Sequence, residues 1–145
     1  MTNDIDILND VTKTLIDSHK GYETCVDVSD DSYALQSNFR DRAERRAALI
    51  QEFQSHVRTL GGEPSTSGSV AGAAHRAWTS FTTLFADDEK AAIEAIDDGE
   101  EYLAEKIEAC LNDAAIQPGT RELLQKAYTD AREGERFADA LEKAL

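Results

Sequence analysis

The sequence predicts an all-α protein, a bundle of four long helices with a short crossover helix between the second and the third. Apolar residues recur every three or four positions over four long segments, which is the spacing of one helix face, and no segment alternates as a strand does. Four of the eight glycines and one of the two prolines lie within residues 61–78. We therefore expect one domain, residues 1–145, in which two helical hairpins, 3–60 and 87–145, are joined by a crossover segment.

The first hairpin is expected to hold helices over about residues 3–28 and 32–60. Asp30 or Asp31 can cap the second helix, because a carboxylate oxygen can accept a hydrogen bond from the free N–H groups of the first turn. Gly61 is suited to end that helix, since glycine adopts a positive φ at little cost. The turn between the helices is short, so they should lie antiparallel.

Residues 61–86 are expected to cross the bundle. A short helix over about 70–85, capped by Ser67 or Ser69, carries the only tryptophan, Trp78. At 1.5 Å per residue this helix spans roughly 22 Å, enough to carry the chain most of the way along a bundle. The second and third helices then run parallel, as in ferritin-like bundles with a single crossover. A segment that folded back on itself would give a simple up-down-up-down bundle instead.

The second hairpin begins with three acidic residues at 87–89, which favour the positive end of a helix dipole. Its first helix should end near residue 114, and its second should start at Pro118 or Thr120 and run to the end of the chain. A short internal match relates the hairpins: Gly-Tyr-Glu at 21–23 resembles Gly-Glu-Glu at 99–101.

The formal net charge is −14, of which −4 falls in residues 1–60 and −10 in residues 87–145. Such a chain should be repelled by nucleic acid and by anionic lipid, which bind clusters of Lys and Arg. No run of 18 apolar residues predicts a membrane span, and the acidic N-terminal residues lack the apolar region of a secretory signal. We therefore expect a cytoplasmic protein with no nucleic-acid or membrane partner.

Several motifs together resemble a known family. They are Leu-Gly-Gly-Glu-Pro at 60–64, Gly-Ser-Val-Ala-Gly followed by His-Arg-Ala-Trp within 68–78, Gly21-Tyr22, the arginines Arg42, Arg45 and Arg46, and Gly99-Glu100. The chain resembles a bacterial domain-of-unknown-function family in the ferritin-like superfamily, distantly related to the YciF-type stress-associated proteins. The resemblance covers essentially the whole chain. It implies a four-helix bundle with a crossover helix and a link to stress physiology, and it implies no established activity.

The di-iron site of ferritin-like proteins provides a test of metal chemistry. Such a site needs a glutamate from each of two helices and Glu-x-x-His from each of the other two. The sequence contains no Glu-x-x-His. The carboxylates that remain as weak candidates for metal ligands are Glu23, Glu100, Glu101 and Glu135.

Charged residues also interrupt the apolar helix faces. Glu100 and Glu135 lie on otherwise apolar stripes, where a carboxylate is costly unless it is paired, and Arg46 and Arg132 occupy comparable positions. The favoured interpretation is an internal ion-pair layer of these four residues in place of a metal. A carboxylate metal site, or solvent-facing charges if the helical register is shifted, are the alternatives.

The sequence shows no catalytic signature. It lacks a Gly-x-Ser-x-Gly elbow, and neither cysteine has an activating base at helical spacing. We therefore expect a bundle that is not an enzyme, has no cofactor, and acts through a protein partner or through self-association, for example as a homodimer. Tyr33, Leu49 and Phe137 lie off the main stripes and are candidate interface residues. The alternative is an iron-handling protein or oxidoreductase of the ferritin type.

Overall fold

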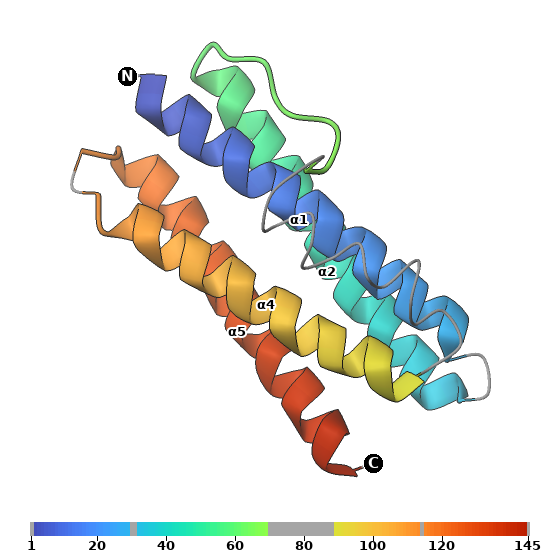
Figure 1. Cartoon of the computed structure of the whole chain (residues 1–145). Coiled ribbons are helices and arrows are strands. Elements are labelled where there is room, and N and C mark those ends of the chain that lie inside the picture. The colour runs from blue at the N-terminus through green and yellow to red at the C-terminus, as the bar shows by residue number, and fades with distance from the viewer. Residues whose placement is uncertain (1, 30–31, 70–88, 114, 145) are drawn as a thin grey trace.

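The computed structural model describes residues 2–29, 32–69, 89–113 and 115–144, and it folds them into four helices (Figure 1). These are α1 (Thr2–Val28), α2 (Tyr33–Thr59), α4 (Glu89–Leu111) and α5 (Pro118–Ala144). The described residues contain no strand. The prediction of an all-α four-helix bundle is therefore confirmed, with each helix close to the segment that the apolar spacing indicated.

The N-terminus of α2 is capped by Ser32. Its backbone is extended, with φ −127° and ψ 103°, and its hydroxyl oxygen accepts a hydrogen bond from the Leu35 N–H at 3.3 Å. The expected caps, Asp30 and Asp31, lie outside the described residues, and the cap role is filled by the serine that follows them. A serine hydroxyl serves as well as a carboxylate in this position, because either oxygen can accept from the first free N–H groups.

The C-terminus of α2 ends as the sequence predicts. Gly61 has a φ of 88°, in the left-handed region that glycine tolerates. Its N–H donates to the Arg58 carbonyl, and the Gly62 N–H donates to the Val57 carbonyl, both at 2.9 Å. These two bonds form a Schellman motif, which satisfies the last carbonyls of the helix and turns the chain away from its axis.

The helix directions show that the chain crosses the bundle between α2 and α4. Helices α1 and α2 form an antiparallel hairpin, and both α2 and α4 begin at the lower right in Figure 1. Contacts agree, because Asp10 of α1 pairs with Lys106 at 2.8 Å while Tyr22, further along α1, bonds to Glu100, earlier in α4. Thus α1 and α4 are antiparallel, α2 and α4 are parallel, and a simple up-down-up-down bundle is excluded.

The first part of the crossover runs along α1. The side-chain oxygen of Asn9 accepts from the Ser65 N–H at 2.8 Å, and Asp17, two turns further along α1, accepts from the Ser69 N–H at 3.1 Å. The segment therefore travels from the start of α1 toward its end. The predicted helix over 70–85 lies outside the described residues.

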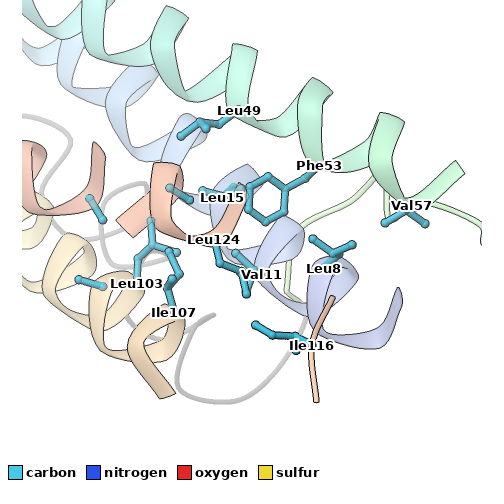
Figure 2. Close-up of a cluster of buried hydrophobic side chains, with 13 residues drawn as sticks. Leu8, Val11, Leu15, Leu49, Phe53, Val57, Leu103, Ile107, Ile116 and Leu124 are labelled. Carbon is cyan, nitrogen blue, oxygen red and sulfur yellow. The ribbon is translucent and has the colours of Figure 1, made fainter. Parts of the chain in front are cut away.

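Two apolar clusters form the core, one on each side of the bundle's midpoint. In the first, shown in Figure 2, Leu15, Phe53 and Leu124 come from three different helices and lie together. The second contains Phe39, Ile93 and Ile96. The residues of each cluster are buried and come from all four helices. No helix among the described residues is long and apolar enough to cross a bilayer.

The four helices are arranged as a square. Helix α1 contacts α2 and α4, and α5 contacts α4 and α2, so α1 and α4 form one side of the bundle while α2 and α5 form the opposite side. Of these neighbouring pairs, α2 and α5 are the least closely packed.

The three candidate interface residues differ in exposure. Tyr33 is 82% exposed, and Phe137 is half-buried with its ring edge-on to Phe39 at 5.6 Å. Leu49, expected on the outer surface, is buried. It lies three residues after Arg46 and four before Phe53, both fully buried, so helical geometry places it on the same inward face.

Candidate functional site

A cluster of polar and charged side chains occupies the middle of the bundle, between the two apolar clusters. We call it the central cluster, and every described helix contributes to it. Its members are Ser18 and Tyr22 of α1, Arg42 and Arg46 of α2, Glu100 of α4 and Asp130 of α5.

The pair Arg46–Glu100 forms the heart of the central cluster. Arg46 donates from Nη1 to Oε1 of Glu100 at 2.8 Å and from Nη2 to Oε2 at 2.7 Å. Both side chains are fully buried. This bidentate contact, with two parallel hydrogen bonds from one guanidinium to one carboxylate, is the strongest kind of arginine–carboxylate pair.

The remaining polar atoms of the pair are also bonded. Arg46 donates from Nη1 to the Ser18 hydroxyl at 2.7 Å and from Nε to the Asp130 carboxylate at 3.1 Å. The Tyr22 hydroxyl donates to Oε2 of Glu100 at 2.6 Å. A buried ion pair is tolerated only when such additional bonds replace the lost hydration.

A second arginine completes the charge balance. Arg42 donates to the Asp130 backbone carbonyl at 2.8 Å, and it lies 3.2 Å from the Asp130 carboxylate and 3.6 Å from that of Glu100. The Arg42 and Arg46 guanidinium carbons lie 5.7 and 5.6 Å from the centre of the Tyr22 ring, within cation–π range. Two cations and two carboxylates therefore neutralise each other around one tyrosine.

The electrostatics hold Arg46 and Tyr22 each in one protonation state. Burial by itself would lower the pKa of Arg46, but the charge and hydrogen bonds of Glu100 outweigh it and raise that pKa. The pKa of Tyr22 is raised well above its usual value, chiefly by burial and then by the negative charge of Glu100. Neither the Arg46 guanidinium nor the Tyr22 hydroxyl therefore exchanges a proton near neutral pH, and this argues against acid–base catalysis by these two groups.

A glycine of α5 makes room for the pair. A Cβ added at Gly134 would overlap the Glu100 carboxylate and would lie 2.7 Å from the Tyr22 hydroxyl oxygen. Only glycine at position 134 therefore lets α5 approach α1 and α4 while Glu100 keeps its present position.

The structure brings together two of the four residues expected in the ion-pair layer. Arg46 and Glu100 meet in the centre. Arg132 and Glu135 do not join them, but pair with each other at 2.6 Å in a half-exposed position. The residue of α5 that reaches Arg46 is Asp130, and the two-residue step from Asp130 to Arg132 rotates a side chain by about 200° around the helix.

The candidate metal ligands are not brought together. Glu23 is exposed and lies 3.5 Å from His19 of its own helix, and Glu101 is also exposed. Glu135 is paired with Arg132, and Glu100 is enclosed by the central cluster. These four carboxylates therefore do not form a common ligand set.

Sequence reasoning missed five residues of this centre, Ser18, Tyr22, Arg42, Asp130 and Gly134. Two signals were available. Arg42 lies one turn before Arg46 and so on the same helix face. The internal match between residues 21–23 and 99–101 aligns Tyr22 with Glu100, and these two side chains are hydrogen-bonded in the structure.

A group of three acidic side chains, separate from the central cluster, lies between α4 and α5. Carboxylate oxygens of Asp97, Asp139 and Glu142 lie within 4.8 Å of one another. The pKa of Asp97 is raised to about 7, first by burial and then by the charge and hydrogen bond of Glu142, with smaller contributions from Glu135 and Asp139. Asp97 therefore holds its proton in the folded state at mildly acidic pH.

The proton on Asp97 makes the stability depend on pH. Between about pH 4 and 7 the folded chain holds a proton on Asp97 that the unfolded chain has lost. The stabilisation of the folded chain that comes from this proton is therefore complete below about pH 4 and disappears as the pH rises through 7. We expect Asp97→Asn to raise the melting temperature at pH 8 by roughly 3 °C, about 1 kcal/mol for a partly exposed group, and to flatten its pH dependence. Melts at pH 5 to 8 check this against exposed Asp98→Asn. Parallel pH profiles for the two variants would contradict the assignment.

The fold and centre define a class: an all-α four-helix bundle whose middle is closed by its own arginine–glutamate pair. The family comparison is more specific. Residues 3–113 match the family described as Domain of unknown function (DUF2383), and the chain belongs to that family. The matched span includes Tyr22, Arg46 and Glu100 and ends before α5. No curated protein and no solved structure matches the chain.

Proposed function

We propose that this chain is a non-catalytic member of the ferritin-like superfamily that acts through association, with a copy of itself or with another protein, in the stress physiology of the bacterial cytoplasm. The observation that carries the proposal is the closed Arg46–Glu100 pair. Both oxygens of the carboxylate are taken by one guanidinium, and both residues are fully buried. A centre filled by the protein's own charges stabilises the fold, and its Glu100 carboxylate is not free to bind a ligand. The outer surface is therefore where the protein would bind its partners.

The residues of this centre do not fit a di-iron site. Hard carboxylate oxygens and imidazoles would have to surround the metal. Here a guanidinium carrying a positive charge lies within 2.8 Å of both Glu100 oxygens, and the sequence offers no Glu-x-x-His. A cation placed beside Glu100 would meet Arg42 and Arg46, and like charges in a buried site repel strongly.

Metal analysis tests the non-catalytic part of the proposal. We expect protein purified without an affinity tag, incubated with ferrous iron and then desalted, to retain no iron by elemental analysis. Retention of one or two irons per chain, lost in Glu100→Gln and Glu101→Gln variants, would favour the iron-handling alternative. Exposed Glu108→Gln is the matched control for loss of a surface carboxylate on the same helix.

Sedimentation velocity tests the association part. The chain is labelled at its N-terminus and measured alone and in an extract of its source cells. A species heavier than one chain in either sample is expected. A single monomer peak in both samples would contradict a function based on association.

A further inference from the structure

The two sides of the bundle carry very different charges. Helices α1 and α4 together hold fourteen acidic and four basic residues, a formal charge of −10. Helices α2 and α5 together hold nine acidic and ten basic residues, a formal charge of +1. Since each pair forms one side of the bundle, the net negative charge that the four helices carry lies on the α1/α4 side, and this side contributes most to the repulsion between two copies.

The near-neutral side also carries a groove, which lies between α2 and α5. One part has a volume of about 550 Å³ and is lined by Arg45, Ala48 and Leu49 with Lys126 and Glu133. A second part, of about 510 Å³, continues it toward His56 and Gly119. Both parts share Glu52 and Lys126, so the groove extends along this side.

The side is large enough for a stable dimer. Helices α2 and α5 have 27 residues each, which corresponds to a length of about 40 Å. Two neighbouring helices about 10 Å wide cover roughly 800 Å², the area that each partner contributes to a standard protein interface.

Charges on the two walls of the groove face each other at matching heights. Lys126 of α5 lies 2.9 Å from both carboxylate oxygens of Glu52 of α2. Seven residues away along each helix, Arg45 of α2 lies 3.6 Å from Glu133 of α5. Each wall therefore carries one cation and one anion, in the opposite order to the other wall.

This order makes the side complementary to itself. A two-fold axis parallel to the groove would place α2 of one copy over α5 of the other, antiparallel and at the same heights. Arg45 would then face Glu133 of the partner subunit, and Lys126 would face Glu52 of the partner subunit. The same axis turns the two acidic α1/α4 sides away from each other, so the arrangement also minimises repulsion.

We propose that the α2/α5 side is a self-association surface, through which two copies of this chain form a two-fold symmetric dimer. The inference rests on the proposed function and specifies its partner and its surface. A basic partner would be drawn to the α1/α4 side instead, because that side holds the negative charge. A second copy is thus the occupant that the charges of the groove fit.

Charge reversal and restoration test the proposal by sedimentation equilibrium over roughly 1 to 100 μM chain. The natural chain is expected to dimerise. Lys126→Glu places two glutamates opposite each other and should weaken the dimer at least about tenfold, while the double variant Glu52→Lys/Lys126→Glu should restore the affinity to within about threefold. The double variant restores the Glu52–Lys126 pair within each chain as well as the contact between copies, so the melting temperature of each variant is measured to separate an interface effect from damage to the fold.

Exposed alanines give an independent, matched pair of variants. Ala48→Glu puts a charge into the groove and should weaken the dimer, whereas Ala109→Glu, on exposed α4 surface, should not. A dimer that survives both Lys126→Glu and Ala48→Glu overturns the surface assignment and leaves association itself standing. A monomer at all concentrations also overturns it, and if cell extract then yields no heavier species the proposed function falls as well.

Discussion

Replacement of Arg46 by alanine is expected to lower the free energy of unfolding by about 4 kcal/mol, the cost of leaving a buried carboxylate without its partner. Glu100 would keep the Tyr22 hydroxyl and the Arg42 guanidinium, which lies 3.6 Å away, but would lose both of its hydrogen bonds from Arg46. Arg58→Ala is the matched control, because Arg58 lies on the exposed face of the same helix and should change stability by less than about 0.5 kcal/mol. Denaturant titration of both variants measures the difference.

Two further variants make the Arg46 result specific. Arg46→Lys keeps the charge but loses the bidentate contact with Glu100, so its stability should lie between that of Arg46→Ala and that of the natural chain. Arg46→Met with Glu100→Leu removes both charges and should be more stable than Arg46→Ala alone, since no unpaired carboxylate remains. Equal, small losses for Arg46→Ala and Arg58→Ala would show that the pair does not hold the bundle together.

The second large effect is expected at Gly134. Glycine to alanine inside a helix normally stabilises a protein by up to about 1 kcal/mol. Here we expect the opposite, a loss of about 3 kcal/mol, because the new methyl group would overlap the Glu100 carboxylate and force α5 or the ion pair to move. Thermal and denaturant unfolding of Gly134→Ala check the sign as well as the size.

A double-mutant cycle identifies the cause of the Gly134 effect. If the methyl group acts by displacing Glu100, then Glu100→Ala should cost much less in the Gly134→Ala background than in the natural chain. Additive losses would mean that the methyl group disturbs the packing of α5 independently of the ion pair.

The helices could be predicted from the sequence because their causes are local. Apolar spacing sets the inward face of each helix, and Gly61 ends α2 through its own backbone freedom. Half of the ion-pair layer could be predicted for the same reason: Arg46 and Glu100 each interrupt an apolar face and so must lie inside.

The partners of those residues could not be predicted, because they depend on how the helices are rotated and shifted against one another. Arg132 was expected in the same ion-pair layer as Glu100, yet Asp130 is the residue of α5 that bonds to Arg46. Side chains two residues apart point about 200° away from each other around a helix. Apolar spacing does not fix the rotation and shift of one helix against another closely enough to decide which of the two faces Arg46. The need for Gly134 arises only from the close approach of α5 to Glu100 and Tyr22.

The distribution of charge shows most clearly what the sequence determines and what only the tertiary structure decides. The sequence alone determines a net charge of −14 and places most of it in the second half of the chain. The tertiary structure decides that the acidity lies on one side of the molecule. The crossover makes α1 a neighbour of α4 and α2 a neighbour of α5, so two acidic helices from different halves come together and the two balanced helices form the opposite side. The order of the helices around the bundle decides which charges of the chain share a surface. That order follows from the burial of apolar faces rather than from the charges themselves.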